Sequence, residues 1–242
     1  MQEPICIANP RIMPGWEKYE YAKLVHQVYY SKALKQFRKI GSNSIANELL
    51  IFEFLNLVGL RTMGFHVPDA AALIDEDYQA LGYQTVEVSG VDEQYDKLIT
   101  AEVDIEKFFI LNLVRFILGD KCASEDGNII WSNGHFYSID VESNDLSEED
   151  VSSEMDWMRH SFADLALRPE QITSVIASAL STCDTFLTGE SEATLQSCYD
   201  NPQLVSAYLK RVHDNRLRVG RHLAQCFSHE TGYNNPSFEF HA

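Results

Sequence analysis

The sequence lacks the patterns of secreted, membrane-spanning and zinc-binding proteins. No apolar run reaches the about 18 residues that a helix needs to cross a bilayer, and the N-terminus, MQEPICIANPRIMPG, shows no signal-peptide pattern. The five cysteines are scattered and contain no CxxC pair, which argues against a disulfide framework or a zinc site. We therefore expect a cytoplasmic protein with free thiols that does not associate with membranes.

Several short catalytic motifs are also absent. The chain has no HExxH zinc sequence, no G-x-S-x-G nucleophile elbow, no G-x-G-x-x-G fingerprint and no Walker A sequence. Motifs therefore give no support to a zinc or serine hydrolase, a dinucleotide-binding enzyme or a P-loop NTPase.

Positive charge is scarce, with 19 Lys and Arg against 36 Asp and Glu and a formal net charge of −17. Nucleic acids and anionic membrane surfaces both attract clustered cations, so neither is an expected partner. An acidic run extends from Asp140 to Asp156 and includes the sequence SNDLSEEDVSSEMD. We interpret this acidic run as either a solvated loop or a docking surface for a basic protein partner.

The composition is otherwise that of a globular protein, with 45% apolar and 23% charged residues, and 242 residues can bury a substantial core in one large domain or two small lobes. We place a boundary in the acidic segment 89–97, which separates an α+β unit, residues 1–88, from a second unit, residues 89–242. In the first unit, residues 24–32 and 81–88 predict strands from their β-branched and aromatic residues and their alternation.

Four segments outside residues 108–142 have helical patterns. Residues 45–58, preceded by N-cap residues and followed by a glycine, are apolar on most faces and predict a buried helix. Further helices are predicted at residues 155–167 and 169–186 and in a final segment that begins at Pro202. That final segment carries the basic residues Lys210, Arg211, Arg216, Arg218 and Arg221. We interpret this basic face as neutralising the protein's own acidic surface.

Residues 108–142, FFILNLVRFILGDKCASEDGNIIWSNGHFYSIDVE, contain most of the candidate functional residues. The mostly apolar residues 108–118 predict a buried helix that ends at Gly119. Two short strands at residues 129–131 and 135–139, separated by Ser-Asn-Gly, predict a β-hairpin.

Asn128 and Asp140 flank the predicted hairpin, and its closure would bring them about one strand spacing, roughly 5 Å, apart. Two oxygen ligands at that separation suit one Mg²⁺, which fills its shell with phosphate and water. Asp120, at the exit of the preceding helix, could supply a third carboxylate. Glu142 is either a second metal ligand or a solvent-facing residue.

Two charged residues lie upstream of this stretch. Lys32 lies at or just past the end of its predicted strand, where it is either solvated or bound to a partner. Glu48 lies in the first turn of helix 45–58, where the helix N-terminus stabilises a carboxylate, although a charge in so apolar a segment also usually has a partner such as Lys32. In chain order, the lysine, glutamate, aspartate, asparagine and second aspartate are the residue types that kinases use for phosphoryl transfer.

The segment VRFILGDKCASEDGNIIWSNGHFYSIDVE resembles the catalytic core of bacterial HipA-like kinases, most closely the short branch of that family. The upstream sequences VYYSK and NELLIFEFLNLVGL resemble the lysine strand and the glutamate helix of the same family, so the resemblance covers residues 24–142. It implies a two-lobed protein-kinase-like fold, with a small β-rich N-lobe and a helical C-lobe, and ATP and Mg²⁺ as cofactors.

The resemblance also implies a role for each polar residue. Lys32 would contact the nucleotide phosphates, and Glu48 would orient it. Asp120 would be the catalytic aspartate, and Asn128 and Asp140 would bind Mg²⁺.

The chain departs from the family pattern in three ways. Lys121 stands where an arginine is expected. Asp120 and Asn128 are eight residues apart, whereas about five is usual in kinases, so Glu125 or Asp126 in the longer loop could act in place of Asp120. No glycine-rich loop is present to cover the phosphates.

We therefore expect a kinase that transfers a γ-phosphoryl group to a hydroxyl of a protein Ser or Thr or of a small molecule. The alternative is a catalytically impaired kinase-like module that binds or regulates partners through its acidic surface. A third hypothesis is an acidic inhibitor that acts through surface charge alone, whose binding would weaken steeply with salt.

Overall fold

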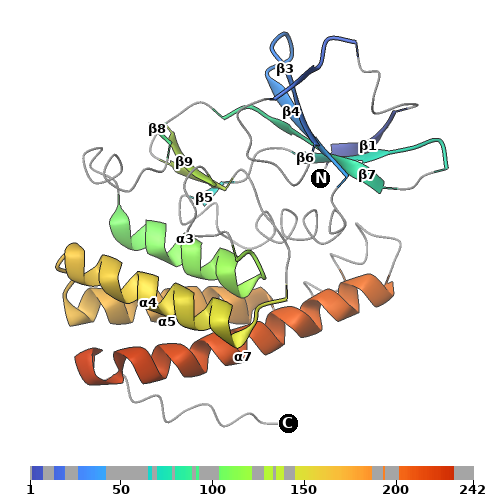
Figure 1. Cartoon of the computed structure of the whole chain (residues 1–242). Helices are drawn as coiled ribbons and strands as arrows, with labels where there is room; N and C mark the ends of the chain where they lie inside the picture. Colours follow the sequence, from blue (N-terminus) through green and yellow to red (C-terminus); the bar gives the residue numbers. More distant parts are fainter. Residues whose placement is uncertain are drawn as a thin grey trace.

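A computed structural model gives the structure of the chain and describes residues 2–7, 14–19, 27–41, 65–66, 70–77, 80–88, 91–92, 104–121, 128–132, 135–138, 145–186, 193 and 202–231. In these residues the protein is α+β, as predicted, with a large sheet at one end and the helices at the other (Figure 1). This layout is compatible with two lobes. The predicted helix 45–58 lies outside the described residues, as do Glu48, Glu125, Asp126, Asp140 and Glu142.

Six strands form the large sheet in the order β1-β6-β7-β4-β3-β2. They are β1 (Gln2–Cys6), β2 (Glu17–Lys18), β3 (Gln27–Ser31), β4 (Gln36–Ile40), β6 (Ala70–Ile74) and β7 (Ala80–Val86). Strands β1 and β6 are parallel, and the other neighbouring strands of this sheet are antiparallel. Strands β3 and β7 confirm the two strands predicted for this part of the chain. The central position of β4 in the sheet gives it a neighbour on both edges.

A smaller sheet has the strand order β5-β10-β9-β8. Its strands are β5 (Phe65–His66), β8 (Val91–Asp92), β9 (Ile129–Ser132) and β10 (His135–Ser138). Strands β9 and β10 are antiparallel, with Ile129 opposite Ser138 and Ser132 opposite His135, which confirms the predicted hairpin. The hairpin forms the middle of this sheet, because β5 pairs with β10 and β8 pairs with β9.

The described helices are α3 (Ile105–Ile117), α4 (Glu148–Asp164), α5 (Pro169–Phe186) and α7 (Pro202–Thr231). They confirm the helices predicted at residues 108–118 and 169–186 and from Pro202. The acidic run is a helix from Glu148 onward, so its interpretation as a loop is wrong for that part. The reason is a capping box, in which the Ser147 hydroxyl accepts from the Asp150 N–H (3.1 Å) and the Asp150 carboxylate accepts from the Ser147 N–H (2.8 Å).

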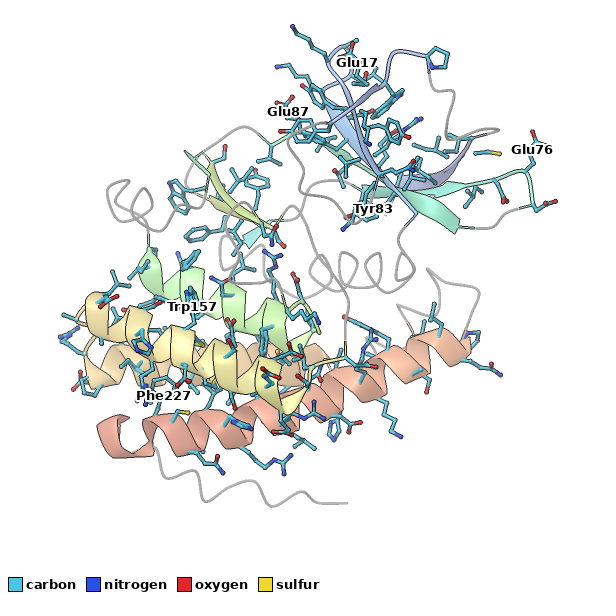
Figure 2. The ribbon with its side chains drawn as sticks, viewed as in Figure 1. Glu17, Glu76, Tyr83, Glu87, Trp157 and Phe227 are labelled. Atoms are coloured by element: carbon cyan, nitrogen blue, oxygen red, sulfur yellow. The ribbon has the colours of Figure 1, made fainter. Side chains whose placement is uncertain are left out.

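Helix α3 lies at the centre of the helical part and is buried from Phe108 to Ile117. It lies between the small sheet and the other helices in Figure 1. The ring of Phe108 lies 6.0 Å from that of Phe136 in β10, and the ring of Phe109 lies 4.7 Å from that of Phe162 in α4. The same hydrophobic core continues to Tyr83 of the large sheet, which Figure 2 labels. One hydrophobic core therefore joins α3 to both sheets.

The basic face of α7 binds acidic residues of the same chain, as predicted. Three arginines form ion pairs: Arg211 with Asp145 (3.5 Å), Arg216 with Asp184 (2.7 Å) and Arg218 with Glu148 (3.1 Å). Two of these pairs involve residues of the acidic run, which is thus partly neutralised within the chain. In the part of the chain that the structure describes, we find no helix that combines the length and the hydropathy needed to cross a membrane.

Candidate functional site

Asp120 directly follows α3 at a sharp turn of the chain. Leu118 is the C-cap of the helix, and Gly119 has a φ of 100°, a conformation that glycine adopts without a steric penalty. The Gly119 N–H donates to the Phe116 carbonyl (2.9 Å) and the Asp120 N–H to the Arg115 carbonyl (3.1 Å), which are the two bonds of a Schellman motif. The turn brings Asp120 back over the last turn of α3.

Arg115 binds both Asp120 and Asn128. Its Nε and Nη2 donate to Oδ2 of Asp120 at 2.9 and 2.5 Å, and its Nη1 donates to the main-chain carbonyl of Asn128 at 2.8 Å. The side chains of Arg115 and Asp120 are 0% exposed. One guanidinium group therefore holds two of the predicted site residues at the junction between α3 and β9.

Helix α7 binds the same end of α3. The Asn215 amide donates to the carbonyl of Ile117 (3.2 Å), and the Tyr208 hydroxyl donates to the carbonyl of Leu118 (3.5 Å). Carbonyls at the end of a helix have no partner within the helix, so these side chains supply partners for two of them. Burial raises the pKa of Tyr208, which keeps its hydroxyl protonated and able to donate. The backbone that precedes Asp120 is thus held from α7 as well as from α3.

Lys32 lies at the position that the sequence predicts, just past the end of its strand, and its role as a phosphate-binding residue stays a prediction. Strand β3 ends at Ser31, and Lys32 is exposed in the turn between β3 and β4. The lysine that the sequence analysis missed is Lys39, which is 5% exposed on β4. Its ammonium group lies 5.9 Å from the centre of the Tyr83 ring. Lysine is seldom buried, so the burial of Lys39 on a central strand makes it a functional candidate beside Lys32.

The face of the large sheet that carries Lys39 also carries a group of aromatic side chains. Side chains alternate along a strand, so Phe37 and Lys39 lie on the same face of β4. Tyr30 is opposite Phe37 on β3, with ring centres 4.7 Å apart, and Tyr19 lies 5.3 Å from Phe37. The Tyr30 hydroxyl donates to Glu87 (2.7 Å), and this bond to a carboxylate raises the pKa of Tyr30. Half-buried aromatic rings beside a lysine can receive a nucleobase and its phosphates.

The predicted metal site includes Asn128 and Asp140. Asn128 is half-buried and immediately precedes β9, as predicted. The separation between Asn128 and Asp140 stays a prediction, because Asp140 lies outside the described residues. Within the described ranges, no group of three or more His, Cys, Asp and Glu residues forms a candidate metal site.

Comparison of the chain with protein-family models and with curated proteins finds no match. The resemblance to HipA-like kinases therefore stays a hypothesis.

Proposed function

We propose that the protein is an ATP- and Mg²⁺-dependent kinase that transfers a γ-phosphoryl group to a hydroxyl of a protein Ser or Thr or of a small molecule. The observation that carries the proposal is the junction of α3 and β9, where Arg115 holds Asp120 and Asn128 together. Kinase chemistry needs an aspartate for the attacking hydroxyl close to an asparagine that binds the metal, and these two residues supply both types.

The energetics of this junction support a functional role. Taking two charges out of water costs several kcal/mol per ion by typical estimates, and a well-packed apolar pair is often at least as stable. Arg115 and Asp120 are nevertheless completely buried, in and just after α3, which is the most apolar of the described helices. Buried charges with specific partners occur frequently at functional sites.

On the nucleotide side, Lys39 takes the place that the sequence analysis assigned to Lys32. Lys39 lies on a central strand of the sheet, on the same face as the aromatic rings of Phe37 and Tyr30. A lysine attracts the nucleotide phosphates as a point charge, and the rings offer a stacking surface for the base. Glu48 keeps its proposed role as the carboxylate that orients the lysine.

On the metal side, the donor types of Asn128 and Asp140 fit Mg²⁺, which prefers amide and carboxylate oxygens. A bound Mg²⁺ would neutralise charge on the transferred phosphoryl group. The Arg115 bond fixes the main chain at Asn128 and so limits where its side-chain amide can lie.

A second function is favoured by one observation. Oδ2 of Asp120 accepts two hydrogen bonds from Arg115, and the carboxylate is 0% exposed. A catalytic base must come within hydrogen-bond reach of the substrate hydroxyl. A carboxylate held in this way also suits a kinase-like protein that binds nucleotide and regulates a partner without transferring phosphate.

The experiment that tests the proposal is thermal unfolding with ATP, with and without Mg²⁺, on the wild type and on Asp140→Ala. A ligand at a hundredfold excess over its Kd stabilises the native state by about 2.7 kcal/mol. We expect a Mg²⁺-dependent stabilisation in the wild type and its loss in Asp140→Ala. Asp164→Ala is the control, because it removes an exposed aspartate at the end of α4.

A phosphotransfer assay then separates the two functions. The kinase predicts transfer from labelled ATP that Asp120→Asn abolishes while ATP binding survives. Binding of Mg²⁺ and ATP with no transfer to any acceptor would favour the regulatory module. No stabilisation by ATP at any concentration would rule out the proposed nucleotide site.

A further inference from the structure

We propose that Arg115 is a positioning residue, whose guanidinium sets the separation between Asp120 and Asn128, the two residues that flank segment 121–127 of the sequence. This inference rests on the proposed function, because it assigns a role within that same site. It gives a way to hold together two site residues whose spacing departs from the usual kinase spacing, because one side chain binds both.

The contacts of Arg115 with Asp120 and Asn128 depend on the planar shape of its guanidinium group. Three of its nitrogens are used at once, two on the Asp120 carboxylate and one on the Asn128 carbonyl. These acceptors lie on separate parts of the chain, before and after the segment. A planar fork of N–H donors can span them, whereas the single ammonium of a lysine is a compact point charge.

The origin of Arg115 in α3 makes it a rigid support. Its backbone lies in the last turn of a helix that is buried from Phe108 to Ile117. The carbonyls that follow, at Ile117 and Leu118, are bound by Asn215 and Tyr208 of α7. The guanidinium therefore extends from a fixed backbone, and the segment ends that it binds become fixed as well.

The chain contains a matched control in Arg216. Its Nε and Nη2 donate to the two carboxylate oxygens of Asp184, each at 2.7 Å, and this pair joins α7 to α5. The Arg216 side chain is 7% exposed, so it resembles Arg115 in burial and in bonding to a carboxylate. Its carboxylate partner belongs to α5 and not to the segment that follows α3.

The test compares Arg115→Lys with Arg216→Lys in the full chain. The first measurement is the Kd of ATP by calorimetry at several Mg²⁺ concentrations. Changes to residues that orient metal ligands typically cost about 10- to 100-fold in metal affinity. We expect Arg115→Lys to weaken Mg²⁺-dependent ATP binding by that factor and Arg216→Lys to leave it unchanged, although both variants lose an arginine–carboxylate pair.

The second measurement is hydrogen exchange at the amides of residues 121–128, which needs no ligand. Arg115→Lys should accelerate exchange there and Arg216→Lys should not. If Arg115→Lys does not fold, the double variant Arg115→Gln with Asp120→Asn removes both charges and keeps amide groups at the contact. The exchange rates of this double variant then show whether loss of the guanidinium accelerates exchange at residues 121–128.

The outcomes separate the inference from the proposed function. If the wild type binds ATP and Arg115→Lys matches Arg216→Lys in both measurements, Arg115 is only a structural residue and the inference is wrong. Faster phosphotransfer by Arg115→Lys would also overturn the inference. It would mean that Arg115 holds Asp120 back from catalysis in the wild type. If the wild type binds no ATP, the proposed function fails, and unchanged exchange at residues 121–128 would overturn the positioning role independently.

Discussion

Lys39 on β4 and Tyr83 on β7 are directly opposite each other, and the Lys39 ammonium group lies 5.9 Å from the centre of the Tyr83 ring. Tyr83 is 3% exposed and belongs to the same hydrophobic core as Phe108 of α3. Figure 2 shows Tyr83 on the side of the large sheet that is turned toward the helices. Lys39 therefore lies on the sheet face that is directed at the helical part of the molecule.

The first prediction distinguishes Lys39 from Lys32 as the phosphate-binding lysine. A hydrogen bond to a charged group contributes about 1.5–3 kcal/mol, which corresponds to roughly 10- to 150-fold in Kd. Lys39→Met should weaken ATP binding by that factor in calorimetry, and the exposed Lys32→Met should leave it unchanged. Equal losses in the two variants would instead support the role that the sequence predicts for Lys32.

The second prediction concerns Gly82, which lies on β7 next to the backbone of Lys39. A Cβ atom at Gly82 would collide with the Lys39 carbonyl oxygen, so β4 and β7 must separate to admit one. We expect Gly82→Ala to lower the free energy of unfolding by about 1–3 kcal/mol, as overpacking usually does. Urea denaturation measures this loss.

The same substitution should also weaken ATP binding, because the strand that must move carries Lys39. Thr85→Ala is the control, since it removes atoms from β7 without adding any near Lys39. Normal ATP affinity in a destabilised Gly82→Ala would separate the sheet geometry from nucleotide binding and argue against Lys39.

Local sequence patterns were sufficient for part of this site. Gly119 indicated where α3 ends, and the turn sequence Ser-Asn-Gly indicated the hairpin, so the sequence placed Asp120 and Asn128 at the ends of the right elements. These signals are local, because caps and two-strand turns depend on residues a few positions apart.

The residues that the sequence analysis missed depend on distant parts of the chain. Lys39 is buried because β3 and β7 flank its strand. Strand β7 begins more than forty residues after Lys39 in the sequence. Arg115 interrupts an apolar run, which signals that it needs a partner, but the pattern does not say which one. Its contact with Asn128 exists only once the hairpin packs at the end of α3.

The third prediction concerns pH and Glu148, the first residue of α4. Its carboxylate lies 2.8 Å from Nε2 of His222 and 3.1 Å from Nε of Arg218. The hydrogen bond with His222, followed by the charge of Arg218, lowers the pKa of Glu148 from its ordinary value of 4.5. Between the folded and unfolded pKa values, the unfolded chain binds more protons than the folded chain, so stability rises with pH across that window.

The contribution of Glu148 to the stability of the folded state is therefore complete above its ordinary pKa. It is lost as the pH falls through the lower pKa that Glu148 has in the folded state. We expect Glu148→Gln to lower the Tm at about pH 5.5, and the difference from the wild type to shrink as the pH falls below 4.5. Glu149→Gln removes a charge from the same helical turn and serves as the control. A difference in Tm that stays constant down to low pH would contradict this assignment.

The fourth prediction concerns Asn112, which is 0% exposed in the middle of α3. Among the described residues, neither its amide nitrogen nor its amide oxygen has a hydrogen-bond partner, and the same holds for the hydroxyl of Ser138. Phe108, Asn112 and Arg115 recur at helical spacing and share one face of α3. Phe108 contacts Phe136 of β10 and Arg115 binds the residue before β9, so this face is the one that meets the hairpin.

An unpaired buried amide destabilises the folded state, and an apolar side chain of similar size removes that cost. We expect Asn112→Leu to raise the free energy of unfolding by about 1–2 kcal/mol, which for a chain of this length is a Tm increase of roughly 2–8 °C. Calorimetry on Asn112→Leu and Ser138→Ala measures both sites. A decrease in stability in both variants would instead indicate an internal water held between α3 and the hairpin, because removing either polar group would then leave that water without a partner.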